Sequence, residues 1–349
     1  MTSLRLGFVA GLTLVAFGCQ GPGVAREEIP ENPIAFIFHP EDEARRRAEA
    51  QAERAKTNAH NARSGSENLA VVHLNTFRDY LEQAIGNRTA DRFAGRLSLL
   101  NPRNRRVTVL ESTRKGAIPL AWSPSRDRLL FAQWDLGTLQ LFEFDRDSRV
   151  VSQLTQGPAQ HPQGCYGPAG RLVAVVATRA EPTEGGARRS GLASRIAVLG
   201  RGDAIESISQ GPTDGEPACS PDGTALAYVR LFPDERSEIW IHSFTDEVPD
   251  RAIAQGREPA FSPDGEWIVY SRVVAKTPTL WRIRRDGTGR SRLGRGSGTH
   301  EYGPAVSPDG SLVVYESVFQ NRYRLFVRRF DGSGDRVLFS DGDGTHAVW

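Results

Sequence analysis

The chain has 349 residues, enough for one large core or two domains, and its charges are nearly balanced, with 44 basic and 42 acidic residues and a formal net charge of +2. This balance, with arginines scattered along the whole chain, argues against the basic surface that binds nucleic acid. No apolar stretch in the sequence reaches the ~18 residues that a membrane-spanning helix needs.

The first 19 residues predict an export signal. Arg5 gives a positive start, a short apolar region runs from Leu6 to Phe17, and the small residue Gly18 stands before Cys19. This order resembles the signal of bacterial lipoproteins, in which the cysteine is lipidated and becomes the new N-terminus. We expect residues 1–19 to be a lipoprotein-type signal peptide ending at a lipidated Cys19. The alternative is an ordinary secretory signal with a chance cysteine, and either interpretation exports the protein. As a lipoprotein, we expect it to be anchored in the bacterial cell envelope, facing the periplasm or the cell surface.

Residues 20–67 differ in composition from the rest of the chain. Residues 20–33 are rich in Gly, Pro and Glu, which is typical of a tether. Residues 41–62 are rich in Ala, Arg and Glu, which favours a solvated helix or a disordered spacer, with a partner-binding helix as the alternative. Between them, Ile34–Phe38 is an isolated apolar run that we expect to dock on the folded part, at a place that the sequence does not indicate.

From residue 68 onward the chain repeats one pattern. Ser-Pro-Asp-Gly occurs unchanged at 220–223, 262–265 and 307–310, and altered copies begin at Ser123 and Gly167. Proline presets φ, aspartate bonds its own backbone and glycine accepts a positive φ, so each copy predicts a tight turn between two strands. The turn prolines stand at 124, 168, 221, 263 and 308, which gives spacings of 44, 53, 42 and 45 residues. Such a period is typical of a four-stranded propeller blade.

The two ends of the repeat region predict one shared blade. Leu69–His73, Phe93–Leu100 and Val107–Leu110 match the second, third and fourth strands of later units, but no first strand precedes them. Gly344–Trp349 supplies it from the other end of the chain, so that the ring closes without an open sheet edge. Five anchored units and this shared blade predict an all-β fold, a six-bladed β-propeller of four-stranded antiparallel blades over residues 68–349.

The repeats resemble a known family. The repeated Ala-x-Ser-Pro-Asp-Gly, the tyrosine-bearing strand after it, and Asp-Gly-Thr-Gly or Asp-Gly-Ser-Gly before the fourth strand are similar to the WD-like repeats of the TolB family. The resemblance covers most of residues 69–349. It implies a periplasmic propeller that binds other proteins and is not an enzyme. The chain differs from that family because it has no room for the α/β domain that precedes the propeller there and carries a lipidation signal of its own, so only the fold and the class of binding module are carried over.

The sequence lacks recognisable catalytic motifs. It contains no Gly-x-Ser-x-Gly, no phosphate-binding loop of the Walker type and no Cys/His spacing for zinc, so we expect no cofactor. The function that we predict is a monomeric, non-catalytic scaffold for an envelope protein or a small ligand, attached to the membrane through its N-terminal lipid. The rival hypothesis is a metal-assisted lyase or hydrolase that acts on glycans at the channel mouth.

Polar residues concentrate in the loops that join the fourth strand of one blade to the first strand of the next. In a propeller these loops surround the mouth of the central channel on one face. His300 and His346 each follow Gly-Thr, so we expect them at matching places of adjoining blades. A ligand or metal site is one interpretation, and ordinary loop polarity is the other. The candidate binding residues are His161, Glu216, Glu258, His300, Glu301, Asp343 and His346, with Asp214 in the same set of loops.

Strand order predicts a working face. Alternate connections of a four-stranded meander lie at opposite ends, so the connections between second and third strands share the face of the blade-to-blade loops. Two long insertions, Leu74–Arg92 and Thr178–Ser194, fall in these connections, and a helix is expected over Thr76–Ile85. The Ser-Pro-Asp-Gly turns should lie on the opposite face.

Cys165 and Cys219 lie in the first strands of neighbouring blades. An oxidising compartment would permit a disulfide between them. However, Cys165 stands three residues before its turn proline and Cys219 two, so we expect the side chains on opposite sides and the thiols free and buried.

The run Asp341-Gly342-Asp343-Gly344 resembles half of a calcium loop but lacks the remaining ligands, which favours a turn.

Overall fold

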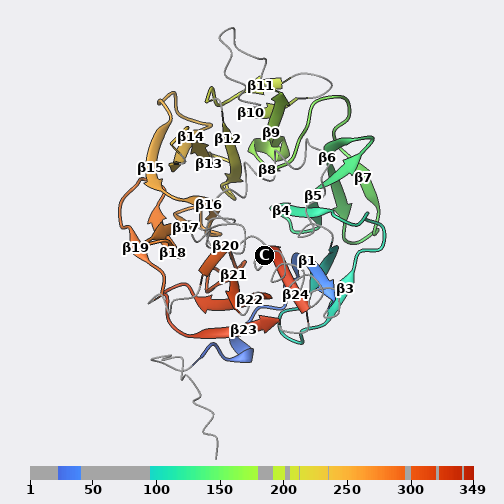
Figure 1. Ribbon diagram of the computed structural model, residues 1–349, viewed down its shortest axis with the longest axis vertical. Coiled ribbons are helices and arrows are strands. Elements are labelled where there is room, and N and C mark those ends of the chain that lie inside the picture. The colour runs from blue at the N-terminus through green and yellow to red at the C-terminus, as the bar shows by residue number, and fades with distance from the viewer. Residues whose placement is uncertain are drawn as a thin grey trace, which may run out of the picture.

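The computed structural model describes residues 23–40, 95–179, 192–200, 205–211, 213–234, 236–294, 300–319, 322–339 and 342–349. These residues form six four-stranded antiparallel sheets arranged in a ring (Figure 1), which confirms the predicted six-bladed β-propeller. Two short 3₁₀ turns, η1 (Arg26–Glu28) and η3 (Pro168–Gly170), accompany the strands. Within the described part of the chain, no helix is long and apolar enough to cross a membrane.

Each blade runs from an inner strand near the ring axis to an outer strand at the rim (Figure 1). The shared blade contains β24 (Gly342–Val348), β1 (Ile34–Pro40), β2 (Arg96–Leu100) and β3 (Val107–Val109). The second blade contains β4 (Ile118–Trp122), β5 (Arg128–Asp135), β6 (Thr138–Asp145) and β7 (Val151–Gln153). The third contains β8 (Gly164–Tyr166), β9 (Leu172–Arg179), β10 (Leu192–Leu199) and β11 (Ile205–Ser207).

The fourth blade contains β12 (Asp214–Cys219), β13 (Ala225–Leu231), β14 (Ser237–Ser243) and β15 (Arg251–Gln255). The fifth contains β16 (Arg257–Phe261), β17 (Trp267–Val274), β18 (Thr277–Arg284) and β19 (Ser291–Arg292). The sixth contains β20 (His300–Val306), β21 (Leu312–Phe319), β22 (Arg322–Arg329) and β23 (Asp335–Phe339).

The Ser-Pro-Asp-Gly turns join first to second strands, as predicted. In the fourth blade the Ser220 backbone N–H donates to the Ala225 carbonyl at 2.9 Å, and the Ser220 hydroxyl accepts the Ala225 N–H at 2.9 Å. Asp222 accepts the Ser220 hydroxyl proton, and Gly223 has the positive φ of 70° that closes the turn. The side chains of Asp264 and Asp309 make the same bond to their serines, so these aspartates are turn formers.

The second strands form the centre of the core, because both their faces pack against neighbouring blades. Tyr228 and Tyr270 are fully buried on β13 and β17. The buried Tyr228 hydroxyl donates to Asp250 at 2.8 Å, and the Tyr315 hydroxyl donates to Asp335 at 2.9 Å, so burial leaves neither of these two hydroxyls unpaired. The buried Tyr270 hydroxyl has no hydrogen-bond partner within the described residues. This packing holds the inner strands in place around the axis.

The C-terminal strand closes the ring, as predicted. β24 is the inner strand of the shared blade and pairs with β1, for example through Ala35 and Val348. Trp349 follows it and is 5% exposed. Its indole N–H donates to the Asn32 carbonyl at 3.1 Å, and its own carbonyl accepts Arg126 at 3.0 Å. The end of the chain is therefore bonded on both sides of the closing seam.

The second strand of the shared blade is β1, and the prediction that Leu69–His73 would fill this place is wrong. β1 pairs with β24 on one side and with β2 on the other, so the sheet is complete with Ile34–Pro40 in that position. The isolated apolar run whose docking place was left open is thus a propeller strand, and Ile34 to Ile37 are fully buried. Leu69–His73 and the expected helix at Thr76–Ile85 lie outside the described residues.

Cys165 and Cys219 form a disulfide with their Cα atoms 5.7 Å apart, so the expectation of free thiols is wrong. The two side chains do leave opposite sides of their strands, since Cys219 directly precedes its first turn residue, Ser220, and Cys165 stands two before the equivalent Gly167. Around a ring, however, opposite faces of neighbouring blades are the faces that pack together. Both cysteines therefore reach the cluster between the third and fourth blades.

The ring has two faces, which we name by what lies on them. The channel-mouth face carries the starts of the inner strands and the connections between second and third strands, and the turn face carries the Ser-Pro-Asp-Gly turns. β1 ends at Pro40 and β2 begins at Arg96, and β9 ends at Arg179 opposite Leu192, so both long insertions leave from the channel-mouth face, as strand order predicted. Leu74–Arg92 lies outside the described residues, and so do residues 180–191 of the second insertion, whose ends at Thr178–Arg179 and Leu192–Ser194 belong to β9 and β10.

Candidate binding site at the channel mouth

One position of every inner strand contributes to a cavity of about 210 Å³ on the ring axis. In five blades the position lies four residues before the first turn residue, as Glu216 lies before Ser220 and Glu258 before Ser262. In the shared blade, His346 has the same place relative to the register shift of β24. All six of its occupants line the cavity: Pro119, Gln163, Glu216, Glu258, Gly303 and His346. We call this set the axial ring.

A β-bulge directs the axial ring residues toward the axis. In the fourth blade the pairing of β12 with β13 shifts register between Gly215 and Ala218, so that two residues lie opposite one. The fifth, sixth and shared blades contain the same shift. Glu216, Glu258, Gly303 and His346 all have left-handed backbones, with φ of 49°, 55°, 51° and 54°. Only glycine adopts this conformation without a steric cost, so at the other three positions the tertiary structure imposes it.

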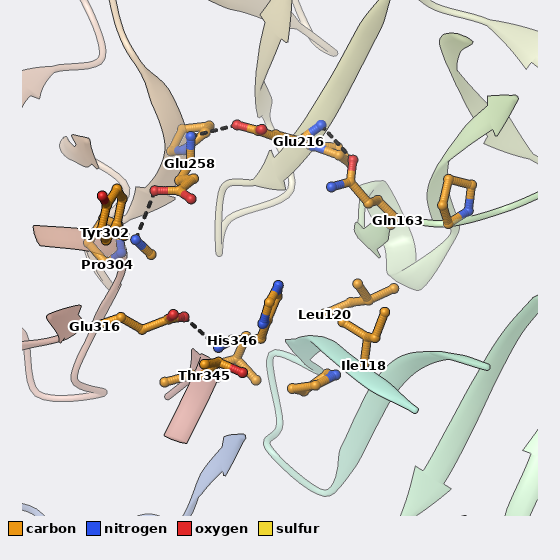
Figure 2. Close-up of a pocket in the computed structure, with 18 of the residues that line it drawn as sticks. Ile118, Leu120, Gln163, Glu216, Glu258, Tyr302, Pro304, Glu316, Thr345 and His346 are labelled. Atoms are coloured by element: carbon orange, nitrogen blue, oxygen red, sulfur yellow. Dashed lines mark hydrogen bonds between the residues drawn. The ribbon is translucent and has the colours of Figure 1, made fainter. Parts of the chain in front are cut away.

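A chain of hydrogen bonds links the axial ring from blade to blade (Figure 2). The Gln163 side-chain oxygen accepts the Glu216 N–H at 2.8 Å, and the Glu216 carboxylate accepts the Glu258 N–H at 2.7 Å. The Glu258 carboxylate then accepts the Gly303 N–H at 2.8 Å. Each side chain thus satisfies a backbone donor that the bulge of the next blade leaves unpaired.

In the sixth blade the axial residue is Gly303, which has no side chain to continue the series of hydrogen bonds. Glu316 on β21, the neighbouring strand, supplies the carboxylate that accepts the His346 N–H. A Cβ on Gly303 would come within 2.9 Å of this carboxylate, so glycine leaves the space that Glu316 needs. At the second blade the series ends, because Pro119 has no N–H to donate.

The charge of Glu216 is balanced inside the site. Its Oε1 accepts Arg257 Nη2 at 2.6 Å and Arg257 Nε at 3.1 Å, while Oε2 accepts the Glu258 N–H. The two side chains are only 10% and 9% exposed. A carboxylate and a guanidinium removed from water in this way stabilise each other strongly, and each would be costly without its partner.

Glu258 lies beside this pair, and within the described part of the chain its carboxylate accepts a hydroxyl and a backbone N–H. Its Oε2 accepts the Ser271 hydroxyl at 2.6 Å as well as the Gly303 N–H. Desolvation raises the pKa of Glu258 above its usual value, and the nearby Glu216 carboxylate raises it further. Both effects favour the neutral, protonated form of Glu258.

The wall of the cavity combines apolar and polar groups. Proline follows the axial residue in three blades, at 217, 259 and 304, and removes a backbone donor from the wall each time. Leu120, Tyr302 and Tyr323 add apolar surface. The Thr345 hydroxyl is buried at the wall with no hydrogen-bond partner within the described residues. Figure 2 shows the His346 ring directed into the cavity from the opposite side to Glu258.

The structure brings three of the predicted residues together and leaves the others out of the cavity. Glu216, Glu258 and His346 line it, whereas His161, Asp214, His300, Glu301 and Asp343 are not among its lining residues. Asp214 is fully buried and bonds Arg230 at 2.8 Å, Glu301 bonds Arg328 at 2.6 Å, and Asp343 bonds Arg322 at 2.7 Å. These three carboxylates form buried ion pairs between strands, which is a structural role.

The predicted histidines His300 and His161 both lie outside the cavity. His300 is the first residue of β20 and stacks on Tyr302, whereas the residue equivalent to His346 in that blade is Gly303. The expectation that His300 and His346 occupy matching places is therefore wrong, because the shared Gly-Thr-His sequence is displaced by three residues relative to the bulge. His161 is 5% exposed, and burial lowers its pKa, which favours the neutral imidazole.

Sequence reasoning missed Gln163, Tyr302, Glu316 and Tyr323. Gln163 could have been found by counting four residues back from each turn, since this count selects the five members of the axial ring whose blades contain such a turn. Glu316 carries no such signal, because it lies on a second strand and compensates for a glycine on the neighbouring strand. Within the described residues, no group of three or more His, Cys, Asp or Glu side chains is arranged to hold a metal ion.

The protein is thus a six-bladed β-propeller with a cavity at the channel mouth, lined by the axial ring. Its fold is of the TolB type. Among solved structures it is similar to a putative TolB from Agrobacterium tumefaciens, with TM-score 0.57 and 20% identity over 71% of this chain and 90% of that one. It is also similar to TolB from Acinetobacter baumannii, with TM-score 0.60 and 14% identity over 91% of this chain and 66% of that one.

The same fold occurs in a protein of different function. Hydrazine synthase from Kuenenia stuttgartiensis matches with TM-score 0.61 and 12% identity, over 91% of this chain and 46% of that one. At such identities the similarity concerns the fold, and a propeller fold supports many functions. No protein-family model matches the chain, and no curated protein matches it.

Proposed function

We propose that the protein is an exported, lipid-anchored β-propeller that acts as a non-catalytic scaffold in the bacterial cell envelope and binds a protein partner or a small ligand at the channel-mouth face. The observation that carries this proposal is the axial ring. One residue from each blade lines a single cavity, and side-chain bonds between neighbouring blades fix the wall from Gln163 to His346. A wall that is already ordered loses little conformational freedom when a partner binds.

The contacts of the carboxylates favour binding over chemistry. Glu216 is neutralised by Arg257, and both Glu216 and Glu258 use oxygen atoms to hold backbone N–H groups of the following blade. Glu216 uses both of its oxygen atoms in these contacts, so moving a proton onto it during a reaction would weaken these bonds. The proline-rich wall and the unpaired Thr345 hydroxyl instead offer an apolar surface with a few placed polar groups, which is the usual character of a ligand pocket.

The location and the anchor are proposed from the sequence. The export signal and the cysteine at position 19 support a lipidated protein of the envelope, and the TolB-type fold agrees with a periplasmic or surface-exposed domain. Residues 1–22 lie outside the described part of the chain. We propose a monomer whose membrane contact is made through the N-terminal lipid.

A matched pair of substitutions tests the binding face. Leu120→Glu places a charge at the cavity wall, and Val150→Glu makes the same change on the turn face, where Val150 is 53% exposed. After melting curves confirm that both variants fold, the lipidated proteins are used to capture partners from envelope extract. We expect Leu120→Glu to lower capture about tenfold, which corresponds to about 1.4 kcal/mol, and Val150→Glu to leave it unchanged. If only Val150→Glu abolishes capture, the partner binds the turn face and the proposed binding face is wrong.

The rival function is a metal-assisted lyase or hydrolase that acts on glycans. It requires a tightly bound metal ion at the channel mouth, with His346 and the carboxylates as the available ligands. Metal analysis of the purified protein separates the two functions. One equivalent of a transition metal that disappears in a His346→Ala variant would support the enzyme and contradict the scaffold.

A further inference from the structure

The chain that precedes β1 docks firmly on the turn face. Val24 and Ile29 are 3% and 1% exposed, and they pack in one cluster with Leu338 and Phe339 of the sixth blade. Arg336 on β23 donates to the Val24 carbonyl at 3.1 Å. Residues 23–33, which we call the strap, therefore belong to the folded body.

Two arginines fasten the strap at both its ends. Arg329 donates to both carboxylate oxygens of Glu28, at 2.7 and 2.8 Å, and to the Gly23 carbonyl at 3.2 Å. Arg103 donates to the Ile29 carbonyl at 3.1 Å and pairs with Glu31. A bidentate arginine pair fixes direction as well as distance, so the first described residue, Gly23, has a definite place at the edge of the sixth blade.

That place is on the turn face. The strap leads into β1 at Ile34, and the neighbouring Ala35 pairs with Val348, at the end of the inner strand farthest from the channel mouth. Arg329 is the last residue of β22, and its N–H bonds the carbonyl of Ser333 across the turn to β23. Gly23, the first described residue, is exposed there.

We infer that the turn face, at the edge formed by the strap and the sixth blade, lies against the lipid bilayer and that the channel mouth points away from it. This inference rests on the proposed lipid at Cys19. Cys19 and Gly23 are four residues apart, and a fully extended chain spans at most about 14 Å over that length. The eight-residue strand β22 is about 25 Å long. The lipid can therefore reach the bilayer beside the turn face, but it is too short to let the channel mouth face the bilayer.

The short tether determines where a partner comes from. With the turn face on the membrane, the axial cavity faces the aqueous compartment. A partner that reaches the cavity must then be soluble or extend from another layer of the envelope, and lipid headgroups of the same leaflet cannot enter it.

Quenching by headgroup-labelled lipids tests this orientation. A fluorophore is attached through an azide-bearing residue at position 331 on the turn face or 136 on the channel-mouth face, where Asp331 and the 98% exposed Leu136 make few contacts. The lipidated protein is placed in vesicles of phosphatidylethanolamine and phosphatidylglycerol that contain a headgroup quencher. We expect several-fold stronger quenching at 331 than at 136. Insertion of a long Gly/Ser segment between residues 19 and 23 should remove the difference, since a flexible chain permits all orientations.

The outcomes separate the orientation from the anchor. Flotation of the cell-made protein with vesicles, which Cys19→Ala should abolish, tests the anchor. If the cell-made protein does not float, the proposed anchor is wrong, and a lipid coupled chemically to Cys19 still allows the orientation to be measured. Equal quenching at both positions with the natural tether, or stronger quenching at 136, would overturn the inferred orientation.

Discussion

Glu216 and Glu258 occupy equivalent positions in neighbouring blades, yet substitution by glutamine should change the free energy of unfolding in opposite directions. Glu216→Gln removes the charge that faces the buried Arg257, and breaking a buried pair from one side costs about 3 kcal/mol. Glu258→Gln keeps both hydrogen bonds, because Ser271 and Gly303 donate to the same carboxylate oxygen and an amide oxygen can replace it.

The pH dependence follows from the raised pKa of Glu258. Between the ordinary glutamate pKa of 4.5 and this higher value, the folded state binds more protons than the unfolded state. In that window the free energy of unfolding of the wild type falls as the pH rises, by up to about 1.4 kcal/mol per pH unit, and the loss persists at higher pH. The Glu258→Gln variant lacks this group, so it should lose that part of the slope and be at least as stable as the wild type at neutral pH.

Urea unfolding followed by tryptophan fluorescence, from pH ~4 to ~8, measures both effects. Glu247→Gln serves as the matched control, because Glu247 is exposed on the turn between β14 and β15 and the same change there should alter little. If Glu258→Gln at pH ~8 loses as much stability as Glu216→Gln, the fold needs the Glu258 charge, and the reasoning from desolvation is refuted.

Three further predictions concern closure, oxidation and the anchor. Deletion of Gly344–Trp349 removes most of the inner strand of the shared blade and exposes strand edges, so cooperative melting should be lost or the Tm should fall by more than ~10 °C; a Tm within a few degrees contradicts the shared blade. Replacing Cys165 and Cys219 by serine should cost about 4 kcal/mol, since the bond closes a loop of 54 residues, and a reductant should lower the Tm of the wild type but not of the variant. A fatty-acid analogue should label the wild type and not Cys19→Ala, and an unlabelled, soluble wild type would indicate plain secretion.

The blades could be predicted because their signals are local. Each Ser-Pro-Asp-Gly turn is specified by hydrogen bonds between residues at most five apart, such as those of Ser220 with Asp222 and Ala225. A turn can therefore be predicted from one copy of the sequence, without knowledge of the rest of the chain. The regular spacing of the turns then determines the number of blades. Closure by the C-terminal strand followed because the first unit lacked an inner strand.

The second strand of the shared blade could not be predicted in the same way. Ile34–Phe38 and Leu69–His73 are both short apolar runs, and strand periodicity does not distinguish them. Which one pairs with β24 depends on the buried contacts of Phe36, which packs against Phe339 of the sixth blade with ring centroids 5.4 Å apart. Such a contact joins residues that are far apart in sequence.

The candidate site was predicted in part, for a reason that lies in the bulge. Successive side chains of a strand point to alternate faces, but the one extra residue at each bulge reverses this alternation for the residues that precede it. Glu216, Glu258 and His346 stand on the bulge and reach the axis, whereas Asp214, Glu301 and Asp343 stand before it and turn into the core. Residue type alone could not separate the two groups, since both consist of polar residues within the same loops.

Strand parity also explains why the two faces of this propeller differ. On the turn face, the connections are short turns held by their own side chains, and the strap is fastened by Arg329 and Arg103. On the channel-mouth face, a connection between second and third strands can lengthen without disturbing any pairing, because β9 and β10 stay fully paired up to Arg179 and Leu192. Changes in partner recognition are therefore easiest to accommodate around the cavity, while the turn face stays constant enough to carry an anchor.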